Sequence, residues 1–396
     1  MSDIAYKQGL ARNIKIYYLQ RLLLGLEFFL PVWVAFELKF TDFAGLAILE
    51  TVHSLVVVFT ELPTGAFADI FGRRKSIILG MFSTAFLYFI FPFSPSFVFM
   101  CFIFALWGLA DTFISGADSA LLYDSLKDID REGEYAKVSS KGALIYRMAI
   151  AFGTLVGGSL YLFWNPAPFL LYGVGYLIAA ISALFLTEPK IDSEKISLSN
   201  YLSQTTRGVK EAFKNFYVSC LSIYYIIIGA FSWAATYYFS NIYAQQNGFG
   251  PREQSILFSI IYFIKSIFAV FIAHSEHLFN RKKIYTTLFI FSVLSFLPAH
   301  FVKGSWIIAI IFATEFVSSL RFTLLDKYVN QEYSSKNRAT ALSFLSLVIS
   351  LIYVLVVYST KDISNTMGVG AIYSVLGLIC LLILTPTTYF LIKNHH

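Results

Sequence analysis

Between Gly65 and Lys75 the chain reads Gly-Ala-Phe-Ala-Asp-Ile-Phe-Gly-Arg-Arg-Lys, and a long apolar run lies on each side of this short charged segment. Glycine adopts backbone conformations that other residues avoid, so the two runs can form helices that turn within about eight residues. The Asp69 carboxylate is suited to accept hydrogen bonds from exposed N–H groups near a helix start. The Arg-Arg-Lys run favours the cytosolic side of a membrane. We therefore expect a tight cytosolic turn between two membrane helices.

The composition of the whole chain is that of a membrane protein. Of 396 residues, 57% are hydrophobic and 18% are aromatic, and the mean hydropathy is +0.67. Charged residues make up 14% of the chain, which is too few to cover a water-exposed surface; soluble domains carry about 25%. These values exclude a soluble enzyme, a disordered chain and a nucleic-acid-binding protein with a basic face.

Apolar runs long enough to cross a bilayer recur along the chain. A helix crosses the hydrocarbon core in about 20 residues. We predict an all-α integral membrane fold of twelve transmembrane helices in two six-helix bundles. Residues 1–187 would form the N-terminal bundle, 188–214 a cytosolic central loop, and 215–396 the C-terminal bundle. The expected spans are 13–37, 42–66, 75–94, 97–122, 138–163, 167–187, 215–244, 252–274, 283–301, 304–327, 338–360 and 367–391.

The distribution of Lys and Arg gives the orientation. With the N-terminus inside, 22 of the 30 Lys and Arg residues fall on the cytosolic side and four fall in outer loops. Basic residues are retained on the cytosolic side of membrane proteins, so both termini are predicted to be cytosolic. The net charge of +6 is therefore a topology signal and does not indicate an acidic partner.

The second half of the chain repeats features of the first. The segment Ala273–Lys283 ends in a basic triplet after a Phe, as Gly65–Lys75 does, and it lies 208 residues further along. A duplication of six spans with a long central loop is typical of secondary transporters whose binding site lies between the halves near mid-membrane.

The first charged segment resembles the G-x-x-x-D-x-x-G-R-[RK] signature of the major facilitator superfamily, and the resemblance extends over the whole chain. The signature is matched by Gly65, Asp69, Gly72, Arg73 and Arg74. In that family the loop gates the cytosolic side of the transporter. The resemblance implies this role for Asp69 and Arg73, with Asp124 at the end of the fourth span as the acidic partner of Arg73.

The fifth span resembles the antiporter motif of drug–proton exporters in the same superfamily, G-x-x-x-G-P-x-x-G-G. Gly153, Gly157 and Gly158 match it, whereas Ala149 replaces the first Gly and Thr154 replaces the Pro. Small residues at this spacing clear one helical face, so a neighbouring backbone can approach closely. Ordinary small-residue packing explains the same pattern, and both interpretations stay open.

Several ionisable residues fall within predicted spans. Each costs about 2.5–3.5 kcal/mol near a helix centre, so they are expected to pair or to line a wet cavity. Asp111 and Asp118 are seven residues apart and would share a helical face. Asp111 and Arg147 lie at similar predicted depth, so they could pair.

Three acids near mid-depth are the main candidates for proton coupling or for holding a cationic group: Glu27, Asp111 and Glu315. Such a role needs a carboxyl group that gains and loses a proton near neutral pH. The candidate set also contains Asp118, Arg147, Arg21 and Arg321. Alternatively, some of these acids only neutralise the arginines.

The seventh span is rich in aromatic residues. Trp233 and Tyr237 are four residues apart, so they share a face and are the predicted cavity aromatics for a planar or cationic substrate. Lipid-facing aromatics are the alternative.

These features predict a proton-coupled efflux transporter (an antiporter) of a small amphipathic or cationic compound such as a drug or metabolite. A proton-coupled importer of a small organic anion or metabolite is the alternative, with Arg21, Arg147 and Arg321 holding the anion. The expected partners are a small-molecule substrate, protons and the lipid bilayer. We expect a monomer in a cell inner membrane and neither an enzyme nor a nucleic-acid-binding protein. No cofactor and no metal site is predicted, since the three Cys lack metal-binding spacing.

Overall fold

The computed structural model describes residues 3–190, 206–274, 280–334 and 337–394. All regular elements in these ranges are helices, which confirms the all-α prediction. Nine helices in the described ranges are long and apolar enough to cross a membrane, and α8 (Ala167–Ala183) is a shorter apolar helix. Helices lie in each of the twelve predicted segments. The count of twelve crossings stays a prediction.

The chain divides into two compact units, which are described separately. The first contains Met1–Thr41, Ile48–Lys195 and Gly250–Phe263, and the second contains Asp42–Ala47, Ile196–Phe249 and Ile264–His396. Two helices, α3 (Phe43–Phe71) and α12 (Pro251–His274), contribute to both. Most of the predicted central loop lies outside the described residues.

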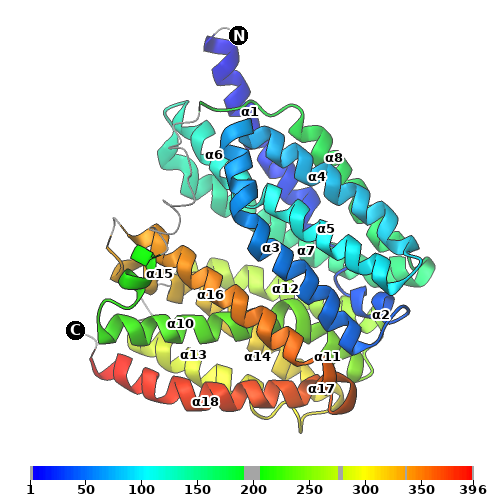
Figure 1. The fold of residues 1–396 in the computed structure, drawn as a ribbon, viewed down its shortest axis with the longest axis vertical. Helices are drawn as coiled ribbons and strands as arrows, with labels where there is room; N and C mark the ends of the chain where they lie inside the picture. Colours follow the sequence, from blue (N-terminus) through cyan, green and yellow to red (C-terminus); the bar gives the residue numbers. More distant parts are fainter. Residues whose placement is uncertain (1–2, 191–205, 275–279, 335–336, 395–396) are drawn as a thin grey trace. The chain divides into compact units, whose positions relative to one another are not determined.

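The first unit is built on α4, which packs against α5 and α8 (Figure 1). Helix α1 packs against α6, α7 and α8. The remaining bounds are α1 (Asp3–Gly25), α2 (Trp33–Glu37), α4 (Arg73–Ile90), η1 (Phe91–Phe93), α5 (Phe97–Ile114), α6 (Ala117–Lys127), η2 (Glu132–Glu134) and α7 (Tyr135–Phe163).

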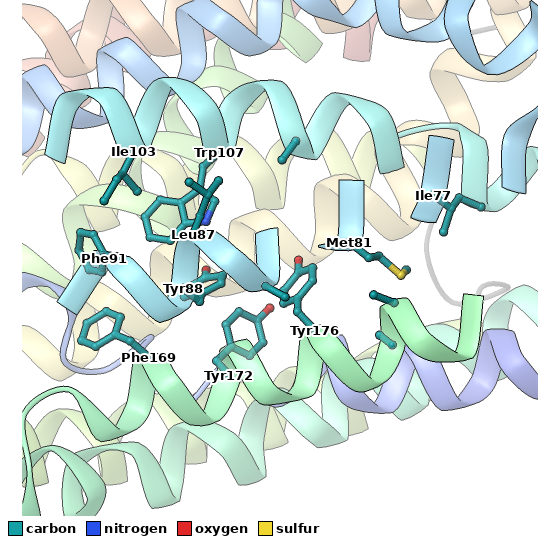
Figure 2. Packing of buried hydrophobic residues seen from close by; sticks show 14 of the residues in the cluster. Ile77, Met81, Leu87, Tyr88, Phe91, Ile103, Trp107, Phe169, Tyr172 and Tyr176 are labelled. Atoms are coloured by element: carbon teal, nitrogen blue, oxygen red, sulfur yellow. The ribbon is translucent and has the colours of Figure 1, made fainter. Parts of the chain in front are cut away.

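Aromatic rings fill the core between α4, α5 and α8 (Figure 2). The Tyr88 ring of α4 lies 4.7 Å from that of Trp107 and 4.8 Å from that of Tyr172, measured between centroids. Tyr172 and Tyr176 of α8 meet edge to face at 5.1 Å. Edge-to-face pairs are favourable beyond their buried area, so this core fixes the positions of α4 and α8.

Two predicted spans of the first unit are interrupted. The first span has a break between α1 and α2, and Glu27 lies within it. The fourth is divided at Ser115–Gly116, where Gly116 has φ of +74°. Because the helix does not continue from Asp111 to Asp118, their seven-residue spacing does not place them on one continuous helical face, and that prediction was wrong.

The second unit is organised around α10 (Phe216–Ala234) and α13 (Arg281–Phe296). Helix α10 packs against α14, α16 and α18, and α13 packs against α14 and α18. Two π-helical segments, η3 (Ala235–Phe239) and η6 (Arg321–Leu325), interrupt the seventh and tenth predicted spans. The other elements are α11 (Ser240–Gln246), η5 (Gly304–Trp306), α14 (Ile307–Leu320), α15 (Asp326–Glu332), α16 (Arg338–Ser359), α17 (Lys361–Thr366) and α18 (Val369–Lys393).

Candidate functional site

The predicted cytosolic turn is a single residue. Helix α3 continues to Phe71 and α4 begins at Arg73, so Gly72 alone reverses the chain, with φ of +103°. A Cβ atom on Gly72 would lie 3.1 Å from the Glu188 carboxyl carbon. Gly65 was expected to ease the turn, but it lies inside α3, where a Cβ would meet no other atom within 4 Å.

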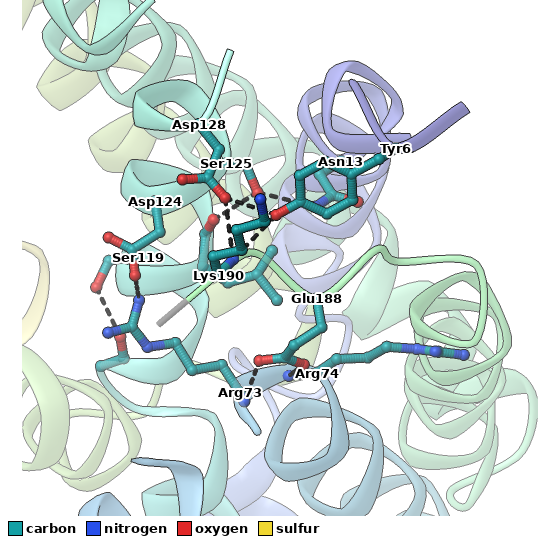
Figure 3. A network of polar contacts seen from close by, with 12 residues as sticks. Tyr6, Asn13, Arg73, Arg74, Ser119, Asp124, Ser125, Asp128, Glu188 and Lys190 are labelled. Carbon is teal, nitrogen blue, oxygen red and sulfur yellow. Dashed lines mark hydrogen bonds and ion pairs between the residues drawn. The ribbon is translucent and has the colours of Figure 1, made fainter. Parts of the chain in front are cut away.

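Glu188 caps the start of α4. Its carboxylate accepts hydrogen bonds from the backbone N–H groups of Arg73 and Arg74, at 2.7 and 2.9 Å (Figure 3). We expected Asp69 to accept from such groups, but Asp69 lies in the last turn of α3 and has no hydrogen bond or ion pair with another described residue. An anion at a helix N-terminus is stabilised by the free N–H groups and the helix dipole. Sequence reasoning missed Glu188, whose only local signal is its place directly after the sixth apolar run.

The expected ion pair between Arg73 and Asp124 is present, joining the start of α4 to α6 (Figure 3). Arg74 donates to the carbonyl oxygen of Leu184, just after α8, at 2.5 Å. The motif therefore ties α4 to both α6 and the end of α8.

The segment after α8 is fastened to α1 and α6 as well. The Asn13 side chain donates to the carbonyl oxygen of Thr187 at 2.8 Å and accepts from its N–H at 2.9 Å. The Tyr6 hydroxyl donates to Asp128 at 2.6 Å, and both accept from the Lys190 N–H. Figure 3 shows this network beside the Arg73 and Glu188 contacts. The end of the first unit where α4 begins, which the sequence predicts to be cytosolic, is thus a connected polar assembly.

The second unit carries an equivalent ion pair that sequence reasoning missed. Arg281, at the start of α13, contacts Glu332, at the end of α15. The two residues lie 208 positions after Arg73 and Asp124 respectively, the same offset as the repeated charged segments. Adding the offset to Asp124 is the signal that would have found Glu332.

The antiporter-like glycines mark close helix contacts. A Cβ on Gly153 would lie 2.9 Å from the backbone nitrogen of Glu27, and one on Gly157 would overlap the carbonyl oxygen of Phe28. The N–H of Gly158 donates to the Ser255 hydroxyl at 2.7 Å, within the first unit. These glycines therefore let α7 approach the break between α1 and α2, where Glu27 lies.

Glu27 is held by a neutral donor. The hydroxyl of Tyr146, on α7, donates to its carboxylate at 2.5 Å, and Glu27 is half-buried. Arg147, the next residue, is exposed on α7.

Asp111 of α5 contacts the His53 ring of α3 at 3.1 Å. The sequence analysis singled out Asp111 but did not predict its contact with His53; the pairing of Asp111 with Arg147 stays a prediction.

Asp118 forms an ion pair with Arg21 of α1. The pair lies in the wall of a cavity of about 190 Å³ within the first unit. In the second unit Glu315 of α14, whose side chain is 2% exposed, forms an ion pair with Lys265 of α12. Two of the predicted acids are thus bonded to cations.

Arg321, in η6, is 4% exposed and makes no ion pair with a described residue. Its guanidinium lies 4.6 Å from the ring centroid of Tyr225 and 4.5 Å from that of Phe322.

The predicted cavity aromatics, Trp233 and Tyr237, are in contact, with ring centroids 6.0 Å apart. Across the described ranges no group of three His, Cys, Asp or Glu side chains is placed to hold a metal ion.

The family model and the relatives with similar sequences point to the same protein family. The model described as Major Facilitator Superfamily matches residues 22–250 and 221–396. The chain is similar to the uncharacterized MFS-type transporter YxaM of Bacillus subtilis (strain 168), with 25% identity over 211 residues, which are 53% of this chain and 52% of YxaM. It therefore spans about half the length of that relative. The uncharacterized transporter BU466 of Buchnera aphidicola subsp. Acyrthosiphon pisum (strain APS) is 22% identical over 307 residues, or 74% of each chain.

Solved structures resemble this fold over nearly its whole length. The nucleoside transporter NupG superposes with a TM-score of 0.69 at 14% identity, over 100% of both chains. A POT family transporter in complex with 5-aminolevulinic acid superposes with a TM-score of 0.69 at 13% identity, over 98% of this chain and 96% of that one. At such identities the likeness concerns the fold alone. Because the family model covers most of the sequence and the curated relatives are transporters, the chain belongs to the major facilitator superfamily of secondary transporters.

Proposed function

We propose that this transporter is a proton-coupled exporter that exchanges external protons for a small amphipathic or cationic compound. It would act as a monomer in a cell inner membrane, with both termini cytosolic and residues 1–187 and 215–396 as its two bundles. Secondary transport follows from the family. The proposal adds the direction of transport, which is export, and the coupling ion, which is the proton.

The contact between Tyr146 and Glu27 is the observation that carries the proposal. Protonating an acid that is bonded to Arg or Lys leaves a partly buried cation without its partner, which is costly. Protonating an acid bonded to a neutral phenol leaves no such charge. Asp118 and Glu315 belong to the first kind and Glu27 to the second. Glu27 is therefore the best suited of these acids to bind and release a proton during each cycle.

Asp111 is the second candidate for the proton path. Its partner His53 carries no permanent charge, because an imidazole can be neutral or protonated, so the pair can lose or gain a proton without leaving a fixed charge unpaired. In the proposed cycle a proton enters from outside, protonates Glu27 or Asp111 and releases the compound, and deprotonation towards the cytosol restores affinity.

The cytosolic ion pairs supply the proposed inner gate. Arg73 with Asp124, and Arg281 with Glu332, each join the start of one helix to another helix at the cytosolic end of a unit. Breaking these pairs would open that end, and Asp69 would contribute to the network in other states of the cycle.

Arg321 favours a second candidate function, import of a small organic anion with a proton. A buried guanidinium that contacts aromatic rings and has no ion-pair partner among the described residues is suited to a carboxylate or phosphate. The interaction of Arg21 with Asp118 argues against the same role for Arg21.

A proteoliposome assay with a pH dye inside tests the proposal. Lipophilic cations, amphipathic metabolites and small organic anions are added in turn to vesicles with an acidic interior. Proton exit on adding a cation or amphipathic compound, lost in Glu27→Gln, supports export. Proton movement only with anions, lost in Arg321→Gln and retained in Glu27→Gln, would replace the exporter with the importer.

A further inference from the structure

A cavity lies inside the first unit, among helices α1, α4, α5, α6, α7 and α8. Its volume is about 190 Å³, and all its lining residues belong to that unit. An engineered apolar cavity of roughly 150 Å³ binds benzene. This cavity is thus large enough for one ring, or a branched alkyl group, that carries a short polar chain.

The charged residues among the described lining are Arg21 and Asp118, which form an ion pair with each other. The ring of Tyr17 lies 4.9 Å from the Arg21 guanidinium and covers one of its faces. The side chains of Arg21 and Asp118 are 29% and 22% exposed, so water screens the pair only in part. The wall therefore offers one positive and one negative group and carries no net charge.

This pairing selects among ligands by charge. A cation that bound Asp118 would leave Arg21 without its partner, and an anion that bound Arg21 would leave Asp118 without one. Leaving one member of a partly buried pair uncompensated is strongly unfavourable. A ligand with both a carboxylate and an ammonium group avoids this cost, because each of its charges replaces the one it displaces.

The rest of the wall fits the body of such a ligand. Met81 and Leu24 give apolar surface, and Tyr172 and Tyr176 give aromatic surface. The Tyr172 hydroxyl already donates to the carbonyl oxygen of Leu24, at 2.9 Å, and the Gln20 amide donates to the Ser182 hydroxyl, at 3.2 Å. With these polar atoms engaged, the apolar part of the wall formed by Met81, Leu24 and the two tyrosine rings favours an aromatic ring or a branched alkyl group.

We propose that this cavity is a binding site for a small zwitterion, with the ligand carboxylate at Arg21, the ligand ammonium at Asp118, and an aromatic or branched apolar body against Tyr172 and Tyr176. Treating this ligand as the transported compound rests on the proposed function; the binding site itself does not. Tyr146 lines the cavity and also donates to Glu27, so an occupant touches the residue that holds the proposed proton site.

Binding to the full chain in lipid nanodiscs tests the site directly. Isothermal titration compares two matched series of probes: phenylalanine, 2-phenylethylamine and 3-phenylpropanoate, and then leucine, 3-methylbutylamine and 4-methylpentanoate. At least one amino acid is expected to bind ten times more tightly than both its amine and its acid. Arg21→Gln and Asp118→Asn should each lower that affinity at least tenfold. Arg131→Gln, which breaks the exposed pair with Glu134, is the matched control and should not change it.

Two further variants keep the test valid if Arg21→Gln or Asp118→Asn fails to fold. Leu24→Phe fills the cavity, leaves the ion pair intact and should abolish binding. The double variant Arg21→Asp with Asp118→Arg keeps a reversed pair and should retain amino-acid binding within tenfold. The site is wrong if neither amino acid exceeds its matched amine and acid, or if Leu24→Phe binds as the wild type does.

Comparing the titration results with proton movement in the proteoliposome assay distinguishes failure of the binding site from failure of the proposed export function. Amino-acid binding without any probe-driven proton movement keeps the site and rejects the exporter. Proton movement driven by a cation, with no preference for zwitterions in titration, keeps the exporter and rejects the site.

Discussion

Arg281 contacts the carboxylate of Glu332 in the second unit, and both residues lie 208 positions after the Arg73–Asp124 pair of the first. In each unit the Arg is the first residue of a helix that begins within the charged segment, and the acid lies near the predicted cytosolic end of another span. The same offset thus relates a charge pair as well as a sequence motif, although the two acids differ in length.

Neutralising either pair should impair transport. We expect each of the four variants Arg281→Gln, Glu332→Gln, Arg73→Gln and Asp124→Asn to lower the transport rate about tenfold. Removing one partner leaves a partly buried charge that costs roughly 1–3 kcal/mol or more. Initial rates in proteoliposomes measure this effect. The exposed pair of Arg131 and Glu134 provides the control, and equal losses in Arg131→Gln would contradict a gating role.

Gly72→Ala should destabilise the protein, whereas Gly65→Ala should not. The backbone of Gly72 has φ of +103° and ψ of +141°, a region that other residues enter only at a cost of about 1–3 kcal/mol. Its Cβ would also press on Glu188, which caps α4. Gly65 lies inside α3 with open space around it, and alanine in a helix is favoured over glycine by about 1 kcal/mol.

The test is to measure the thermal unfolding midpoints of the two glycine variants and the wild type in detergent. We expect a lower midpoint for Gly72→Ala and an equal or higher midpoint for Gly65→Ala. Equal midpoints in both variants would mean that the turn is not strained.

Removing the Tyr146 hydroxyl should slow proton-coupled transport. A hydrogen bond to a charged group contributes roughly 1.5–3 kcal/mol, which corresponds to about tenfold or more in an equilibrium. We expect Tyr146→Phe to lower proton-coupled flux about tenfold while the protein still folds. Tyr123→Phe, at an exposed position on α6, is the control for loss of a tyrosine hydroxyl. Unchanged flux in Tyr146→Phe would argue against Glu27 as the proton site.

Glu211 should make the stability of the protein depend on pH. It lies in a short helix over 206–212, outside the predicted spans. The backbone N–H of Ser334 donates to its carboxylate at 2.8 Å, and Lys214 and Asn337 donate at 2.9 and 3.1 Å. These donors, the Ser334 N–H first, lower the pKa of Glu211 from 4.5 to about 2.

A carboxyl group whose pKa is lowered by folding stabilises the protein fully above its ordinary pKa and loses this contribution as pH falls towards the folded value. Glu211→Gln should therefore lower the unfolding midpoint most above about pH 5, and the difference from the wild type should shrink steadily as pH falls below about 4.5. Midpoints measured from about pH 3 to pH 8 test this, with the exposed Glu132→Gln as control. A difference that grows on acidification would refute the assignment.

The helices and the Arg73–Asp124 contact were predictable because span length, basic residues and the family motif are local features of the sequence. Glu188 and the pairing of His53 with Asp111 were not, since each joins residues far apart in the chain through tertiary packing. The break at Gly116 was missed because a single glycine inside a predicted span does not by itself end a helix. Glu332 was within reach, but it required applying the 208-residue offset beyond the basic triplet.

The central claim is that Glu27 couples the transported compound to protons, and comparing two fluxes in one variant tests it most directly. Glu27→Gln is reconstituted in vesicles, and radiolabelled compound is followed both in equilibrium exchange and under an imposed pH gradient. We predict that exchange persists while gradient-driven accumulation is lost, because the carrier still cycles but no longer binds the proton. If Glu27→Gln accumulates the compound against its gradient as the wild type does, Glu27 is not the coupling residue and the proposed mechanism is wrong.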